Sequence, residues 1–155
     1  MPYYNQNTRQ RLADIGAGIR VDRATATLPQ TDAAAIFTVV GGKCLVLGIV
    51  GEVTTIIQTQ LNNTKLIATP TVGTATDICA ALDISADEVG CLYGITGTAT
   101  DAMVGADAGH TVWPASPIVV NAGTIDLDCA ASNTGSVAWS IWYLPLEDGA
   151  YIEAA

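Results

Sequence analysis

Short apolar runs rich in Val, Ile and Thr follow one another along the chain from Ile19 onward, and Gly, Asn, Asp or Pro interrupts them at short intervals. Intervals of about eight to twelve residues are typical of a β-sandwich or barrel, in which strands alternate with turns. No segment shows the spacing of apolar residues that a long helix requires. The pattern therefore predicts an all-β fold, a jelly-roll or Greek-key β-sandwich of about 8–10 short strands.

Turn-forming residues bound the expected strands on both sides. These strands cover residues 36–40, 43–50, 53–61, 66–69, 78–82, 90–96, 118–121, 124–131 and 136–144, with a further one at 150–153. Gly41-Gly42 separates the first two, and a pair of glycines at such a position favours a two-residue β-hairpin.

The clearest alternation of apolar and polar side chains begins in the segment 124–131. Asp126 and Asp128 alternate there with apolar residues, which predicts one buried face and one face in water. Residues 132–135 are Ser, Asn, Thr and Gly, which tolerate the positive φ angles of a turn. We therefore expect a C-terminal hairpin in which 124–131 pairs with 136–144.

Trp142 breaks the pattern of the second strand of this hairpin. Val137, Trp139, Ile141 and Tyr143 are expected on one face, whereas Trp142 falls on the other face among Ser and Ala residues. Two interpretations remain open for Trp142. It packs beneath a loop or against the second sheet, or it contacts another subunit, since Trp is enriched at interfaces.

Residues 97–117 form a long segment rich in Gly, Ala and Thr, which contains His110 and Trp113. Loops of this kind lie at the surface and often carry function, so we expect variable contacts here. His110 is the single histidine of the chain. Nothing near it in sequence would orient it as the base of a catalytic triad, and metal sites of the cupin type need at least two histidines.

Neighbouring carboxylates occur at 87–88, at 126 and 128, and at 147–148. A glycosidase needs two acids that face each other across a sugar, and a calcium loop needs regularly spaced Asp residues. These acids instead lie in turn-like segments or on the wet face of a strand, which favours solvated side chains. We therefore expect no enzymatic activity, no cofactor and no metal.

Four cysteines lie within apolar stretches and form no Cys-x-x-Cys pair: Cys44, Cys79, Cys91 and Cys129. Unpaired cysteine behaves as a small apolar residue, so we expect buried free thiols. A disulfide that forms after synthesis in a reducing cytoplasm is the alternative.

Charge is distributed unevenly along the chain. Residues 1–23 contain four Arg and two Asp, whereas residues 24–155 contain two Lys and thirteen acidic residues. The first eighteen residues also show little apolar periodicity. We therefore expect two parts, an extended N-terminal arm at 1–23 that lies on another protein surface and a β-sandwich domain at 24–155.

The acidic charge and the short apolar runs exclude two classes of partner. An acidic body repels phosphate backbones, so we expect no nucleic-acid partner. The longest apolar runs fall well short of the roughly 20 residues that cross a bilayer, so we expect no membrane partner. The first residues lack the basic and apolar regions of a secretory signal, which predicts synthesis in a cytoplasm.

Several segments, in this order, resemble a family of small proteins encoded among the head genes of tailed bacteriophages. The resemblance runs from about Ile19 to Glu153. It rests on residues 19–30, 37–42, 48–53, 87–90, 93–97, 123–125, 132–137 and 143–150. Each segment alone is a turn or strand motif, and their order is what carries the resemblance.

This resemblance implies a capsid decoration, or cement, protein. Such proteins are rich in β-structure and often trimeric, and they bind the outer capsid surface at local three-fold axes. The implied location is the outer capsid surface of the virion, and the implied partners are the major capsid protein and two further copies of the chain in a homotrimer.

Aromatic and Arg side chains are the usual anchors of protein interfaces. The residues expected to contact the capsid are therefore Tyr3, Tyr4, Arg9, Arg11, Arg20 and Arg23, with Trp113 and Trp142 as further candidates. Two other functions remain open. One is another virion component, such as a tail, neck or head-fibre protein, and the other is a carbohydrate-binding jelly roll in which Trp113, Trp142 and Tyr93 stack against sugars.

Overall fold

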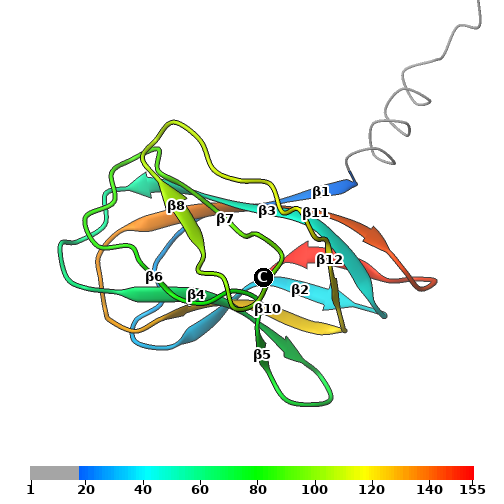
Figure 1. Ribbon diagram of the computed structural model, residues 1–155. Helices are drawn as coiled ribbons and strands as arrows, with labels where there is room; N and C mark the ends of the chain where they lie inside the picture. The colour runs from blue at the N-terminus through cyan, green and yellow to red at the C-terminus, as the bar shows by residue number, and fades with distance from the viewer. Residues whose placement is uncertain (1–17) are drawn as a thin grey trace, which may run out of the picture.

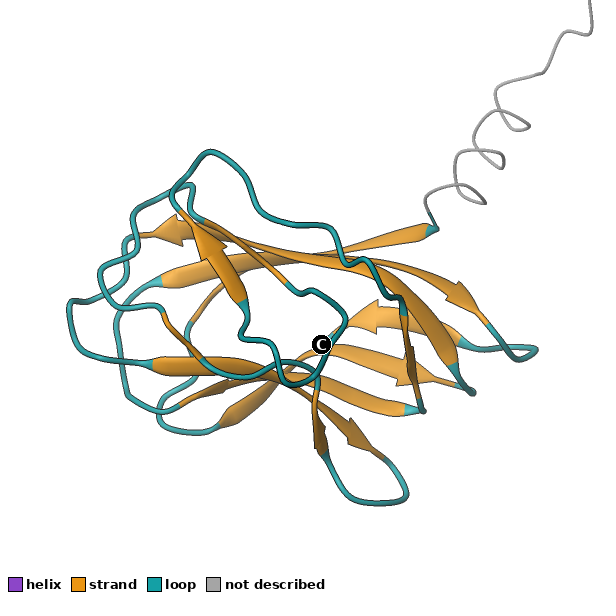
Figure 2. Ribbon diagram, in the orientation of Figure 1, coloured by secondary structure: helices purple, strands orange, loops and turns teal. Residues whose placement is uncertain are grey.

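A computed structural model of the protein describes residues 18–155, which contain strands and loops but no helix (Figure 2). The strands form two antiparallel sheets that pack face to face (Figure 1). Residues 1–17, which make up most of the expected arm, lie outside the described part of the chain. The prediction of an all-β sandwich is confirmed.

Both sheets have six strands. In spatial order, the first sheet contains β1 (Ile19–Thr27), β11 (Ser136–Pro145), β3 (Cys44–Thr55), β7 (Leu92–Gly94) and β8 (Val104–Ala106), and β9 (Ile118–Val120) also pairs with β3. The second sheet contains β12 (Tyr151–Ala154), β2 (Ala33–Val40), β10 (Gly123–Cys129), β4 (Asn63–Pro70) and β5 (Thr76–Asp77), and β6 (Leu82–Asp83) also pairs with β4.

The strand order is that of a jelly roll. The first sheet has the order β1-β11-β3-β7, and the second has the order β2-β10-β4-β5. Successive long strands therefore lie in opposite sheets, and the chain wraps around the core as two Greek keys do. The twelve strands of residues 18–155 exceed the number expected because several contain only two or three residues.

The core lies between the inner faces of the two sheets. Side chains along β11 alternate between buried and partly exposed, as the sequence predicts. Trp139 is 2% exposed and its ring stacks against Tyr93, with 6.3 Å between the ring centroids. Phe37 and Leu66 of the second sheet are fully buried in the same core.

Both predicted hairpins are wrong. Gly41-Gly42 connects β2 in the second sheet to β3 in the first, and residues 132–135 connect β10 in the second sheet to β11 in the first. Each connection is an arch across the core, so its two strands face each other and do not pair. Alternation shows that a strand has a buried face, and turn residues show where the chain reverses. Neither shows whether the next strand pairs in the same sheet, as in a hairpin, or crosses to the other sheet, as in an arch.

The predicted break between residues 50 and 53 is also wrong, because β3 runs through it without interruption. Gly51 is a packing residue and not a turn residue. A Cβ atom at this position would lie 2.8 Å from the ring of Trp139. Glycine within a strand often marks such a close approach of another group.

Three other boundaries differ from the expectation. Residues 19–23, expected as the end of the arm, belong to β1, which pairs with β11 over its whole length apart from a bulge between Arg23 and Ala26. Of the expected strand at 78–82, only Leu82 lies in a strand, β6, because β5 ends at Asp77. The segment 97–117, expected as a loop throughout, contains β8.

Asp126 is not on a wet face, as the sequence suggested. Its side chain is 8% exposed and accepts a hydrogen bond of 2.5 Å from the hydroxyl of Thr69 on the neighbouring strand. Buried polar groups are stable when they are hydrogen-bonded in this way. Asp128 on the same strand is partly exposed.

Replacing Trp139 with Ala removes the largest fully buried side chain. We expect the free energy of unfolding to fall by about 3–5 kcal/mol, because the change creates a cavity between the sheets. Chemical denaturation measures this loss. Trp142→Ala, on the outer face of the same strand, leaves no enclosed cavity and should cost less than about 2 kcal/mol. Equal losses in the two variants would contradict this account of the core.

Candidate protein-binding surface on the outer face of the first sheet

Trp142 projects from the outer face of the first sheet, on the side away from the core. It lies in the middle of the three long strands, opposite Arg20 of β1 and opposite Gly48 of β3. The side chain is partly exposed. The outward position expected from the sequence is therefore confirmed.

Trp113 joins Trp142 on this face, although the two lie in separate parts of the sequence. The segment between β8 and β9 carries Trp113 across the sheet, where the six-membered part of its ring fills the space above Gly48. The two indole rings meet edge to face, with 5.1 Å between centroids and 69° between planes. This geometry is favourable for aromatic pairs, and it leaves Trp113 51% exposed.

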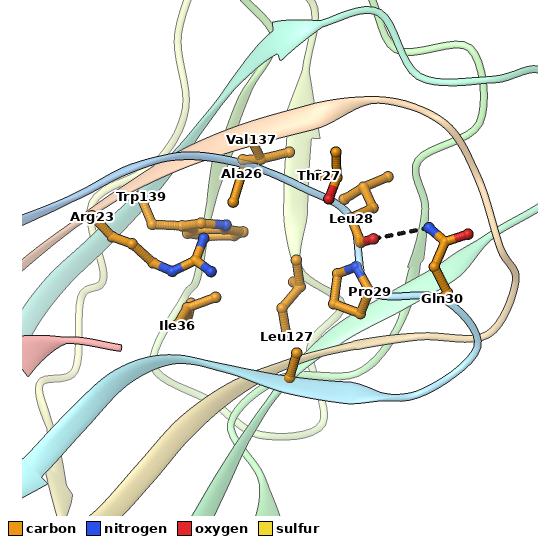
Figure 3. A pocket seen from close by; sticks show the side chains of 11 residues that line it. Arg23, Ala26, Thr27, Leu28, Pro29, Gln30, Ile36, Leu127, Val137 and Trp139 are labelled. Atoms are coloured by element: carbon orange, nitrogen blue, oxygen red, sulfur yellow. Dashed lines mark hydrogen bonds between the residues drawn. The ribbon is translucent and has the colours of Figure 1, made fainter.

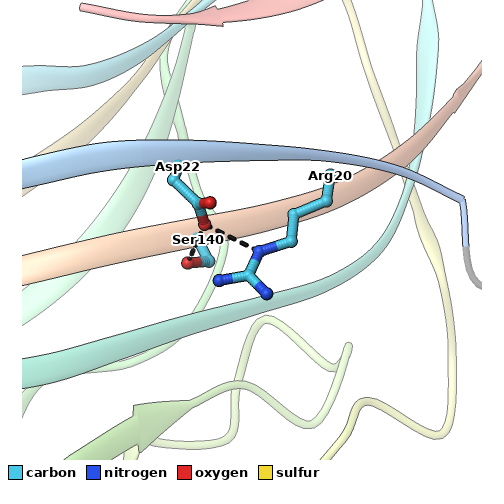
Figure 4. A network of polar contacts seen from close by, with 3 residues as sticks. All are labelled: Arg20, Asp22 and Ser140. Atoms are coloured by element: carbon cyan, nitrogen blue, oxygen red, sulfur yellow. Dashed lines mark hydrogen bonds and ion pairs between the residues drawn. The ribbon is translucent and has the colours of Figure 1, made fainter.

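Arg20 completes the group from the other side. Its guanidinium carbon lies 5.2 Å from the centroid of the Trp142 ring, within the range of a cation–π interaction. Its Nε donates a hydrogen bond of 2.8 Å to Asp22, and the Ser140 hydroxyl donates one of 2.6 Å to the same oxygen (Figure 4). These hydrogen bonds, from Ser140 and then Arg20, lower the pKa of Asp22. The guanidinium is thus held over the ring by an ionised carboxylate.

Apolar side chains that are partly exposed, or exposed in the case of Val119, continue this face along the neighbouring strands. Leu144 of β11 pairs with Leu45 of β3, which in turn pairs with Val119 of β9. Val119 is 58% exposed. We call Arg20, Trp113 and Trp142 together the aromatic platform. Exposed apolar side chains that lie together on one face mark an interaction site more often than scattered ones do.

The aromatic platform lies beside the first residues of the described chain. Gly18 lies against Leu47 and the main chain of Tyr143, and Ile19 pairs with Tyr143. The described part of the chain therefore begins at this edge of the platform. Four of the expected contact residues lie outside the described residues: Tyr3, Tyr4, Arg9 and Arg11.

The structure separates two residues from the others in the expected sites. Arg23 lies on the same strand as Arg20 but pairs with Trp139, so its side chain faces the interior and not the platform. Tyr93, a candidate for stacking against sugars, is 1% exposed and donates a hydrogen bond of 2.6 Å to Asp87. A sugar cannot reach its ring. His110 is exposed in the loop before Trp113.

The thiols are buried, in agreement with the sequence. Burial raises the pKa of all four cysteines, and none of them forms a disulfide. In residues 18–155, no group of three or more His, Cys, Asp or Glu side chains is placed to hold a metal ion. The same residues contain no helix long and apolar enough to cross a bilayer.

Comparisons of the chain with protein-family models, with curated proteins and with solved structures give no match. The surface itself therefore carries the functional inference. Sequence reasoning singled out Arg20, Trp113 and Trp142 separately, but it missed Gly48, whose missing side chain lets the two Trp residues meet. A glycine inside an apolar run is the one sequence feature that could have indicated such a contact.

Gly48→Ala tests how the aromatic platform is held. The new Cβ would overlap the Trp113 ring, which lies on an exposed segment and can move away. We expect the ring pair to separate while the free energy of unfolding changes by less than about 1.5 kcal/mol. Shifts of the indole N–H resonances of Trp113 and Trp142, with Trp139 unchanged, report this. Gly51→Ala is the control. Its new Cβ would meet the ring of Trp139, which is buried and cannot move away, so this variant should lose stability.

The pKa values of Asp83 and Asp87 shift in opposite directions, so the two carboxyl groups affect stability in opposite ways as the pH changes. The main-chain N–H of Asn62 donates to Asp83 and lowers the pKa of Asp83, so this group stabilises the fold above its ordinary value of 3.8 and loses that effect as the pH falls. Burial raises the pKa of Asp87, so its contribution is present at low pH and is lost as the pH rises through the raised pKa.

We therefore expect changes of opposite sign at pH 7. Asp83→Asn should lower the unfolding temperature and Asp87→Asn should raise it, each by about 1–4 °C. Thermal unfolding between pH 3 and pH 7 measures both, and the differences should shrink toward the acidic end. If Asp87→Asn instead lowers the unfolding temperature at pH 7, the hydrogen bond from the Tyr93 hydroxyl to the ionised Asp87 carboxylate stabilises the fold by more than burial of that carboxylate costs.

Proposed function

We propose that the protein is a structural virion protein, which binds the outer surface of a phage capsid as a homotrimer and stabilises contacts between major capsid protein subunits. The observation that best supports this proposal is the aromatic platform. Trp and Arg are the residues most enriched among the hot spots of protein interfaces, and here they are gathered on the flat outer face of a sheet. The order of segments that resembles phage head proteins supplies the identity of the partner.

The aromatic platform is held in place before any partner arrives. Trp113 is seated above Gly48, and Arg20 is held between Asp22 and Trp142. Side chains that are already ordered lose little conformational entropy on binding, so more of the contact energy remains as affinity. The strands beneath the platform support it, because β3 and β11 pair with each other at ten positions.

The distribution of charge also supports binding to a capsid through the aromatic platform. Residues 18–155 contain four basic and fourteen acidic residues, whereas residues 1–17 contain two Arg and one Asp. A basic segment joined at the edge of the platform extends the contact area toward acidic or polar capsid surface. The acidic remainder, facing solvent, keeps particles apart by mutual repulsion. Many copies on one lattice add avidity to a modest contact.

One observation favours a second function. The exposed ring of Trp113 beside Trp142 is also the arrangement that stacks against a sugar, and jelly rolls include lectins. In this alternative the protein binds carbohydrate through Trp113 and Trp142 without Tyr93. A different virion position, in a tail, neck or head fibre, would use the same platform against another protein.

Reconstitution on virions tests the proposal. Particles produced without the protein are mixed with the purified full chain, and bound protein and resistance of the particles to heat are measured. We expect binding and greater heat resistance. The double variant Trp113→Ala/Trp142→Ala should bind at least about 30-fold more weakly. Tyr151→Ala is the matched control, because Tyr151 is an exposed aromatic residue on β12 of the other sheet and its loss should not matter.

Two further measurements separate the alternatives. Electron microscopy of labelled protein on the particles should show a lattice over the capsid, whereas a ring or a single site would favour a neck or tail component. A glycan screen should give no specific binding. Glycan binding that is lost in Trp113→Ala, together with particles that do not bind the protein, would overturn the proposal in favour of the carbohydrate-binding function.

A further inference from the structure

The loop between β4 and β5, residues 71–75, projects from one end of the sandwich (Figure 1). All of its residues are exposed. Val72 is the most exposed large apolar side chain of residues 18–155, with an exposed fraction of 88%. A single exposed apolar residue is ordinary on a protein surface, so the surroundings of Val72 decide what it implies.

Two hollows flank the base of this loop. The first, about 180 Å³, lies between the β4–β5 hairpin and β9. The second, about 280 Å³, lies between the loop and the β2–β3 and β11–β12 connections. Asn121 lines both hollows, so they are neighbouring parts of one depression. We call residues 68–76 together with the lining of these two hollows the hairpin end.

Further exposed apolar side chains border the depression. Val119 lines the first hollow and is 58% exposed. Leu146 is 50% exposed and precedes Glu147, which lines the second hollow. Its N–H donates a hydrogen bond of 3.0 Å to the carbonyl of Lys43 in the same lining. With Val72, three exposed apolar side chains therefore lie at one end of the sandwich, and side chains gathered in this way mark interaction sites.

The hairpin end has no net charge, although the chain as a whole has a net charge of −9. Residues 68–76 contain no charged side chain, and the lining of the first hollow contains none either. Glu147, the one acid in the lining of the second hollow, is paired with Lys43 at 2.7 Å. Asp77, which follows the hairpin, is paired with Lys65 at 2.9 Å. The two lysines of the chain thus both neutralise acids at this end.

Absence of net charge matters because copies of an acidic chain repel one another. The Debye length is about 8 Å at physiological ionic strength, so the charges close to a contact contribute most of the repulsion. The hairpin end is a surface at which two copies can approach without that cost. The cavity of about 220 Å³ between the sheets differs in this respect, since the guanidinium of Arg23 lines it (Figure 3).

We propose that three copies of the chain bind one another through the hairpin end, with Val72 of each copy in the first hollow of the next. This interface rests on the proposed function, which includes a homotrimer, and names the residues that join its copies. A projecting side chain and a hollow on separate parts of one molecule make a head-to-tail contact, which closes into a ring when the rotation fits.

The size of the first hollow agrees with this contact. An apolar cavity of about 150 Å³ accommodates benzene, so a hollow of about 180 Å³ has room for the side chain of a Val. The aromatic platform stays open, because Arg20, Trp113 and Trp142 line neither hollow. Three joined copies therefore present three platforms to the capsid, and their contacts add through avidity.

Sedimentation equilibrium of the purified full chain tests the proposal, and we expect a trimer. Val72→Asp should raise the dissociation constant at least about 30-fold, because it places an unpaired charge in the first hollow of the next copy. Val89→Asp is the matched control, since Val89 is 59% exposed and lies outside the hairpin end. Both side chains are exposed, so neither change disturbs the core. A monomer or a dimer, or a trimer that survives Val72→Asp, overturns the proposal.

Resonance shifts locate the contact in the wild-type chain. The methyl resonances of Val72 and Val119 should shift as the concentration rises through the range in which trimers form. Those of Val89 should stay in place. Trimers that form without a shift of Val72 or of Val119 would contact one another elsewhere and would overturn the proposal.

The ionic strength tests the role of charge. Lys43→Gln leaves Glu147 without its cation, and we expect the dissociation constant of the trimer to rise about threefold or more at low salt. The difference should shrink near 1 M salt, where the Debye length falls to about 3 Å. Arg20→Gln removes a paired cation from the platform instead and should leave sedimentation unchanged. Equal effects of the two variants would show that total charge governs association and would overturn the placement.

Two measurements distinguish failure of this interface from failure of capsid binding. Trp113→Ala/Trp142→Ala should lose particle binding without a change in sedimentation. A chain that binds particles through the platform but stays monomeric overturns the hairpin-end interface and leaves capsid binding in place. A chain that forms trimers through Val72 but does not bind particles supports the interface and overturns capsid binding.

Discussion

The burial of alternate side chains of β11 between the two sheets is the constraint on which the other features depend. β11 lies between β1 and β3, so its inward residues must fill the centre of the sandwich, and Trp139 does so against Tyr93. Once Trp139 points inward, the period of two residues forces Trp142 outward. The two glycines of β3 accommodate the rings on both faces, Gly51 under Trp139 and Gly48 under Trp113. Core packing and the outer surface are therefore set by one strand register.

The pairing of β1 with β11 also decides which way two arginines of β1 point. Arg20 pairs with Trp142 and is placed outside, whereas Arg23 pairs with Trp139 and is placed inside. Outside, the charge is balanced by Asp22 and spread over an aromatic ring. Inside, the Arg23 guanidinium lies beside Trp139 and Ile36, and its Nε donates a hydrogen bond of 3.4 Å to the main-chain oxygen of Ala155. Two arginines that are three residues apart thus face different chemical environments.

The sequence predicts the class of the fold because alternation and turn residues are local properties. The inward and outward faces of β11 follow from the alternation of residues along the strand, and the burial of the cysteines follows from their apolar neighbours. Strand pairing is a different matter. Gly41-Gly42 and residues 132–135 favour a reversal of the chain, but the reversal crosses the core in both cases, since long-range packing decides which sheet receives the next strand.

The candidate sites likewise combine features that the local sequence predicts with contacts that it does not. Arg20, Trp113 and Trp142 can each be singled out by residue type, but their meeting depends on a segment of irregular structure that passes over Gly48. The inward position of Arg23 depends on the register of β1 against β11, which no local pattern indicates. Asp126 is buried because Thr69 on β4 supplies a hydroxyl, and β4 is distant in sequence. What the sequence leaves open is therefore always a contact between distant segments.

The four buried thiols have a practical consequence. All of them lie in the core with a raised pKa, so very little thiolate is available at neutral pH and none of it is accessible to reagents in solution. The folded chain therefore withstands oxidising surroundings without cross-linking to its neighbours. A cysteine introduced on the outer surface would be the one nucleophile that maleimides modify, which makes the native sequence ready for site-specific conjugation without removal of its own cysteines.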